Sequence, residues 1–125
     1  MAKEIDYLEL ADILKLAREI IADFRVREIG LLESAVARPK TSVFGEDAYL
    51  TFAEKTAALL HSIARNHALI DGNKRLAWSA ARLFCLMNDL DINMKQDKAY
   101  EMVVGVAAGQ IEMDELVKIL KKAIR

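Results

Sequence analysis

The sequence predicts an all-α fold, a compact bundle of about six helices with a small irregular flap. Apolar residues recur at three- and four-residue spacing through most of the chain, which is the period of an amphipathic helix. The one Pro of the chain and a group of β-favouring residues fall together in the short segment 39–50. At 125 residues the chain has the length of one compact domain, so we expect residues 1–125 to form a single domain.

The first part of the chain is predicted to hold two helices. From residue 6 to about 24 the pattern is amphipathic, and Asp6 with Glu9 forms a capping box that supports its start. Residues 31–38 are predicted to form a short helix that Pro39 stops, because the residue before a proline avoids helical dihedral angles.

The segment 39–50 is predicted to be a loop or small hairpin-like flap and not a true sheet element. After it, Thr51 and Glu54 repeat the capping-box pattern and open a helix that runs to about Asn66. This helix and residues 74–88 are apolar on most sides, which predicts a buried helical hairpin. Two further helices are predicted at 97–108 and 113–124.

Composition limits the classes of function. Eighteen Lys and Arg against nineteen Asp and Glu give a net charge of −1, which disfavours a broad basic surface for direct nucleic-acid binding. The one cysteine, Cys85, lies in an apolar run and is interpreted as core filler in a reducing compartment. The start lacks a signal-peptide pattern, and no apolar run approaches the ~20 residues that cross a bilayer. We therefore expect a cytoplasmic protein that does not act at a membrane.

The densest polar cluster is NHALIDGNKR, residues 66–75, between the two most apolar helices. His67 continues the spacing of the buried face of the preceding helix, so we expect it at the mouth of the core. Gly72 supplies the positive φ of a tight turn, and Asn73 is a favoured N-cap. The unpaired N–H groups of the following helix then point into this turn, where they can bind an anion.

Three charged residues make this turn suitable for a nucleotide. Lys74 offers a point charge and Arg75 a planar fork to phosphate oxygens. Asp71 supplies the carboxylate that, together with substrate phosphates, commonly holds Mg²⁺. His67 exchanges protons near neutral pH and can accept one from a hydroxyl group. We interpret the segment as a nucleotide-phosphate cradle beside a histidine base.

Other interpretations of the segment remain open. In a purely structural one, Asn73 is a simple cap and His67 a satisfied C-cap, while Lys74 and Arg75 are solvated. Against it, two cations at a helix N-terminus oppose the dipole by a few tenths to about 1 kcal/mol each and call for an anion. A metal hydrolase built on His67 and Asp71 is weaker, because the turn interrupts the helix between them and no further His or Cys is near.

HALIDGNKR is similar to the signature of the Fic/Doc superfamily, H-x-F-x-[DE]-[GA]-N-[KG]-R. GLLESAVARP with the following flap also resembles the death-on-curing (Doc) branch, and the likeness spans nearly the whole chain. The resemblance implies a Fic fold and transfer of a phosphate-containing group from ATP, with Mg²⁺, to a protein hydroxyl. It makes His67 the general base and Asp71 the magnesium-associated carboxylate. The turn and anion hole, and the phosphate ligands, would be Gly72, Asn73, Lys74 and Arg75.

Departures from the pattern refine this expectation. Ala68 and Leu69 replace the Pro-Phe of many relatives. Relatives that transfer AMP have Gly at the position of Lys74 and a second Arg at the position of Trp78. The chain therefore resembles the Doc branch, which implies a bacterial toxin that transfers the terminal phosphate of ATP to a Ser/Thr hydroxyl of elongation factor Tu and stops translation. A Phd-type antitoxin with a disordered tail is the implied partner.

Two alternative functions stay open, namely AMP transfer and a catalytically degenerate module that only binds an antitoxin. Phe44 and Tyr49 of the flap either align a target segment or fold back onto the bundle. His61 is expected at the surface, and Arg82 is expected to form an ion pair and not to extend the basic site. Trp78 is expected in the core.

Overall fold

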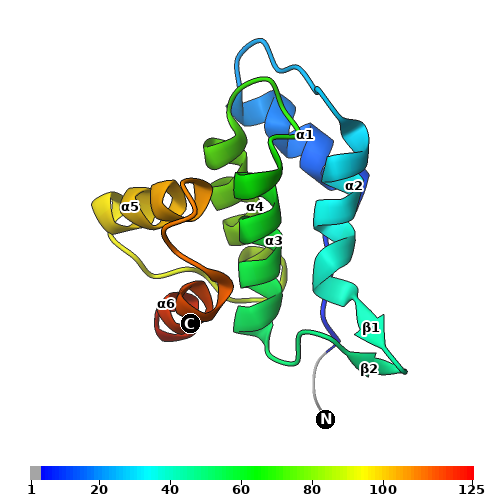
Figure 1. Cartoon of the computed structure of the whole chain (residues 1–125), viewed down its shortest axis with the longest axis vertical. Helices are drawn as coiled ribbons and strands as arrows, with labels where there is room; N and C mark the ends of the chain where they lie inside the picture. The colour runs from blue at the N-terminus through cyan, green and yellow to red at the C-terminus, as the bar shows by residue number, and fades with distance from the viewer. Residues whose placement is uncertain (1–3) are drawn as a thin grey trace.

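In the computed structural model, which describes residues 4–125, these residues form six α-helices, one 3₁₀ turn and one two-stranded hairpin (Figure 1). The helices are α1 (Leu10–Ile20), α2 (Ile29–Ala37), α3 (Phe52–Asn66), α4 (Asn73–Met87), α5 (Gln96–Ala107) and α6 (Met113–Ala123). The 3₁₀ turn η1 covers Arg38–Lys40, and the strands are β1 (Ser42–Val43) and β2 (Glu46–Asp47). The predicted mainly helical fold is confirmed, and residues 1–3 of the expected domain lie outside the described range.

Helix α3 is the centre of the bundle. It packs against α2, α4, α5 and α6, while α1 lies on α4 (Figure 1). Ten of the fifteen residues of α3 are buried, and α4 adds six more, including Phe84. The predicted buried helical hairpin is therefore confirmed. Its all-round apolar surface is needed because neighbouring helices cover it on several sides.

The predicted helix starts are correct in one case and wrong in the other. At α3, the Thr51 hydroxyl accepts a hydrogen bond from the Glu54 N–H at 3.1 Å, as the capping pattern predicts. At α1 the box is formed by Glu9 and Asp12, one turn later than predicted, and the helix begins only at Leu10. Asp6 is instead used in a long-range contact, since its N–H donates to the Asn88 side chain at 2.8 Å.

The segment 39–50 contains a small antiparallel hairpin, which confirms the hairpin-like flap, but its strands pair as a two-stranded sheet, so the prediction that it is not a true sheet element is wrong. Val43 pairs with Glu46, and the two-residue turn between them consists of Phe44 and Gly45. Their φ values are 53° and 80°, the left-handed conformations that two-residue hairpin turns require. A Gly supplies one of them at little cost, whereas a Phe at the other gives no sequence signal for such a turn.

The second helix also differs from its prediction at both ends. Helix α2 begins at Ile29 and includes Gly30, two residues before the predicted start. It ends at Ala37, and Pro39 then continues the chain into the η1 turn, in which its fixed φ is tolerated.

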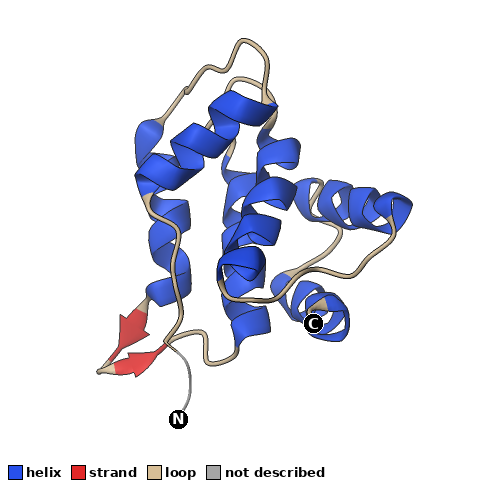
Figure 2. Ribbon diagram, turned by 180° about the vertical axis from the view of Figure 1, so that it is seen from behind, coloured by secondary structure: helices blue, strands red, loops and turns tan. Residues whose placement is uncertain are grey.

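The two irregular parts of the fold lie at opposite ends of the bundle. The loop from 67 to 72 joins α3 to α4 and lies beside the segment that joins α1 to α2, while the hairpin lies at the other end of α3 (Figures 1 and 2). Among residues 4–125, none of the helices combines the length and the apolar character that a membrane span requires.

Candidate functional site

The 67–72 loop begins with a sharp break in the helix. Helix α3 ends at Asn66, and His67 follows in the left-handed conformation with φ 53° and ψ 45°. This turn moves His67 away from the helical register of the buried residues, and its side chain is exposed. The expectation that His67 continues the buried face is therefore wrong, whereas the next two residues, Ala68 and Leu69, are buried.

The backbone of the loop is held by the segment 25–28, which follows α1. The Arg27 and Glu28 N–H groups both donate to the Ala68 carbonyl, at 2.8 and 3.0 Å. The Ile70 N–H donates to the Arg25 carbonyl at 3.1 Å, and residues 26 and 69 form an antiparallel bridge. The Arg27 side chain adds a further bond, from Nη2 to the His67 carbonyl oxygen at 2.6 Å. The loop is thus a fixed element and not a flexible connection.

Gly72, and not Asn73, is the N-cap of α4. Asn73 is the first helical residue and makes no capping bond, so the predicted role of Asn73 is wrong by one position. Its side chain instead bonds twice to one residue of the loop: Oδ1 accepts from the Leu69 N–H and Nδ2 donates to the Leu69 carbonyl, each at 3.0 Å. The amide therefore closes the loop, and the first N–H groups of α4 stay available for an anion.

Gly72 is required by both its conformation and its surroundings. Its φ is +87°, which L side chains rarely adopt. A Cβ built at this position would lie 2.6 Å from the Ile21 Cδ1 atom at the end of α1. Gly72, the predicted turn residue, therefore also lies where the end of α1 packs against the loop.

The residues from 71 to 75 together line a cavity of about 440 Å³ at the start of α4. Its other walls are Ile21, Ala22 and Tyr100. The Asp71 carboxylate accepts a hydrogen bond from the Gly72 N–H at 2.9 Å, which places the carboxylate at the cap of α4. The structure therefore brings five of the six predicted site residues to one cavity, and His67 is not part of its lining.

The cavity is cationic on one wall. Lys74 and Arg75 are both exposed, and Arg75 donates a long hydrogen bond of 3.4 Å to the Ile20 carbonyl at the end of α1. The described residues contain no cluster of three or more His, Cys, Asp or Glu side chains able to enclose a metal. A cation held here would thus take one ligand from Asp71 and the others from phosphate and water, as Mg²⁺ commonly does.

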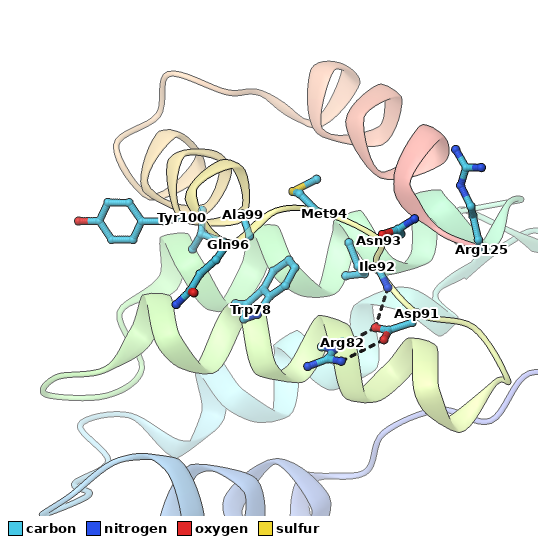
Figure 3. A pocket seen from close by; sticks show the side chains of 11 residues that line it. Trp78, Arg82, Asp91, Ile92, Asn93, Met94, Gln96, Ala99, Tyr100 and Arg125 are labelled. Atoms are coloured by element: carbon cyan, nitrogen blue, oxygen red, sulfur yellow. Dashed lines mark hydrogen bonds and ion pairs between the residues drawn. The ribbon is translucent and has the colours of Figure 1, made fainter.

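A larger cavity of about 820 Å³ lies between α4, α5 and the chain after α4 (Figure 3). Arg82 forms a bidentate ion pair with Asp91 there, at 2.9 and 3.0 Å, which confirms that Arg82 does not extend the basic site. This pairing lowers the pKa of Asp91. Trp78 is partly buried: it packs against the core, as expected, and it also lines this cavity. Tyr100 lines both cavities and marks the place where they adjoin.

The remaining candidate residues do not line the cavity at the start of α4; they are Tyr49, Phe44, His61 and Cys85. Tyr49 folds back, and its hydroxyl accepts from Arg38 Nε at 2.7 Å, whereas Phe44 is fully exposed at the hairpin tip. Because the hairpin lies at the opposite end of α3, neither residue lines the cavity. His61 is half-buried, with Nδ1 3.0 Å from Arg38 Nη1, so its assignment to the surface is wrong. Burial raises the pKa of the Cys85 thiol to about 11, which fits core filler.

Sequence reasoning missed four residues around the site: Ile21, Ala22 and Tyr100 line the cavity, and Arg27 bonds the 67–72 loop. Ile21 and Arg27 lie 51 and 40 positions before their partners, Gly72 and His67, so no local pattern links them. The available signal was weak: the run ADFRVRE, residues 22–28, is charged and unusually polar for a connection next to a buried helical hairpin.

The chain is similar to known proteins over most of its length. Residues 7–85 match the model of the Fic/DOC family. The chain is 41% identical over 114 residues to Toxin Doc of Mycolicibacterium smegmatis, which covers 89% of this chain and 88% of that protein. The match includes the segment after α1, the 67–72 loop and the start of α4, which supply every lining residue of the cavity except Tyr100 of α5. The chain therefore belongs to the Fic/Doc family.

Proposed function

We propose that this chain is a Doc-type toxin that transfers the terminal phosphate of ATP to a Ser/Thr hydroxyl of an elongation factor Tu-like translation factor. The observation that carries the proposal is the cavity at the start of α4, where Asp71, Lys74 and Arg75 surround a helix N-terminus. Likeness to a relative named Toxin Doc supports the toxin assignment.

The cavity residues bind and orient the phosphates. The first N–H groups of α4, with Gly72 at its cap, donate to phosphate oxygens, while Lys74 and Arg75 neutralise their charge. Asn73 keeps the loop closed through its two bonds to Leu69 and thereby fixes where these donors point. Most of the rate enhancement in phosphoryl transfer comes from such positioning and electrostatic stabilisation.

His67 acts as the general base in this reaction. The oxygen of the target hydroxyl attacks the γ-phosphorus, and the bond from the γ-phosphorus to the β,γ-bridging oxygen breaks, so that ADP leaves. The hydroxyl proton passes to the His67 imidazole. The exposed position of His67 suits contact with a protein substrate that approaches the cavity from outside.

Mg²⁺ fits the donor set of the cavity. Asp71 would hold it, with the phosphate oxygens completing the site, and when bound the ion neutralises charge that develops on the phosphates. Lys74 favours phosphate over AMP transfer, because a Lys replaces the Gly that AMP-transferring relatives use at this position. An antitoxin of Phd type is the proposed partner that restrains the toxin in the bacterial cytoplasm.

The test uses ATP that is labelled at either the γ-phosphate or the α-phosphate. We expect label from γ-labelled ATP, and none from α-labelled ATP, on purified elongation factor Tu in the presence of Mg²⁺. His67→Ala should abolish labelling and leave ATP binding intact, whereas the nearby His61→Ala should change labelling little. Transfer of the α-label would replace the proposal with AMP transfer. Absence of both labels, with harmless expression in cells, would leave only an antitoxin-binding module.

A further inference from the structure

The conformation of His67 is strained, and the strain is local to this residue. A left-handed φ of 53° is costly for a residue with a Cβ, and such residues persist only where the surroundings impose them. Within the stretch from 66 to 75, the other residue with positive φ is Gly72, which adopts it readily. Something outside the loop must therefore hold His67 in place.

Arg27 makes two of the contacts that hold the backbone at His67, and one of them is to the His67 carbonyl itself. Its backbone N–H donates to the Ala68 carbonyl at 2.8 Å, and its guanidinium Nη2 donates to the His67 carbonyl at 2.6 Å. These bonds hold the carbonyl groups of His67 and Ala68. Since a peptide group is planar, fixing the His67 carbonyl also fixes ψ of His67.

The hydrogen bond from the Arg27 guanidinium to the His67 carbonyl has a charged donor, which makes it stronger than a hydrogen bond between neutral groups. The His67 carbonyl lies at the C-terminal end of α3, where the helix dipole is negative, and a cation is favourable there. A hydrogen bond with an ionised donor is roughly twice as strong as one between neutral groups. Arg27 is exposed, so its side chain is available for this contact without burying a charge in the core.

We infer that Arg27 is a positioning residue: it clamps the His67 carbonyl and thereby directs the imidazole toward the target hydroxyl. The inference rests on the proposed phosphate transfer. Arg27 does not line the cavity and is not expected to contact ATP, so its effect on the reaction passes through His67.

Arg27→Met tests the inference, because it removes the guanidinium and keeps the backbone bond to Ala68. We expect the rate constant for γ-phosphate transfer at saturating ATP to fall roughly 10- to 100-fold, the usual cost of misplacing a reacting group. The ATP dissociation constant should stay unchanged, and the unfolding temperature should fall by only a few degrees, roughly the cost of one exposed hydrogen bond. Arg27→Lys, which retains one cationic donor, should recover part of the rate.

Arg25→Met is the matched control. It removes the same charge from the same segment, but the Arg25 side chain pairs with exposed Asp23 at 3.1 Å and does not bond the loop. We expect wild-type transfer from it. An Arg27→Met protein with wild-type transfer, or an Arg25→Met protein that loses as much activity, would overturn the inference.

A second measurement does not depend on catalysis. The ¹³Cα and ¹³Cβ chemical shifts of His67 report its backbone dihedral angles, and they should move away from left-handed values in Arg27→Met but not in Arg25→Met. Unchanged shifts would overturn the inference even in a protein that transfers phosphate. If the wild-type chain transfers no phosphate, the proposed function fails, while the shifts still decide whether Arg27 holds His67.

Discussion

At the scale of single residues, Gly72 is required for two physical reasons: its backbone φ is positive, and a side chain at this position would overlap with Ile21. Gly72 and Gly45 have similar positive φ values, +87° and +80°, but only Gly72 has a neighbour within 4 Å of a built Cβ. The comparison of the two positions therefore distinguishes backbone strain from steric overlap with Ile21.

Gly72→Ala should destabilise the protein more than Gly45→Ala. Left-handed strain costs about 1–2 kcal/mol at either position, and the 2.6 Å overlap with Ile21 at position 72 adds roughly another 1–3 kcal/mol. Urea unfolding of the two variants measures the difference. Equal losses in the free energy of unfolding would mean that α1 does not pack tightly against the loop.

Arg27 and Asn73 show what kind of information the sequence lacks at this scale. Residue types in the segment 66–75 predict its chemistry, because His, Asp, Lys and Arg each favour a few roles, such as proton acceptor, metal ligand or phosphate ligand. The bonding of Asn73 to Leu69 was not predictable, since an Asn before a helix is a favoured cap in most settings. The outcome was decided by Gly72, whose positive φ moved the cap one residue earlier.

At the scale of elements, the hairpin depends on a buried cation. The Lys55 side chain is only 1% exposed, and its Nζ bonds the Tyr49 carbonyl at 2.6 Å and the Asp47 carboxylate at 3.2 Å. These contacts join α3 to the end of β2 and to the residues after it. Burial of a charge is tolerated here because the ammonium group has these partners.

Lys55→Met should loosen the hairpin without affecting catalysis. It leaves the Tyr49 carbonyl without its donor, which costs about 1–3 kcal/mol in the free energy of unfolding. Phosphate transfer should be unchanged, because the hairpin lies at the opposite end of α3 from the cavity. Lys98→Met, which removes an exposed charge from α5, is the control and should cost less than about 0.5 kcal/mol. Loss of transfer in Lys55→Met would show that the hairpin takes part in substrate binding.

Element prediction succeeded where the sequence period alone decides the structure. The bounds of α3 to α6 follow from apolar spacing and local caps, and the observed starts and ends differ by only a residue or so from those predicted. The errors fall where long-range contacts decide. Asp6 bonds to Asn88, 82 positions away, in place of a local cap, and Lys55 stabilises a hairpin whose turn carries an unfavourable Phe44.

At the scale of the whole molecule, the proposed nucleotide site at the start of α4 lies where several parts of the bundle meet. Ile21, which directly follows α1, lies beside Gly72. Arg75 bonds the Ile20 carbonyl, and Tyr100 of α5 lines the same cavity. A ligand at this point therefore contacts three helices that are far apart in sequence. Binding to the folded state alone must stabilise the entire bundle by mass action.

Magnesium-ATP should raise the unfolding temperature. At a concentration 100 times its dissociation constant, the ligand adds about 2.7 kcal/mol, which corresponds to roughly 10 °C for a domain of this size. Removal of Mg²⁺ by a chelator should shrink the shift, because in the proposed site the ion would link Asp71 to the phosphates. Lys74→Met/Arg75→Met should abolish it, since the variant loses both cations of the cavity, whereas Lys121→Met/Lys122→Met removes equal charge from α6 and should retain it. Scanning calorimetry decides between these outcomes. A wild-type protein that magnesium-ATP does not stabilise would contradict the assignment of the cavity to nucleotide phosphates, because bound phosphate is the anion expected to offset two adjacent cations at this helix N-terminus.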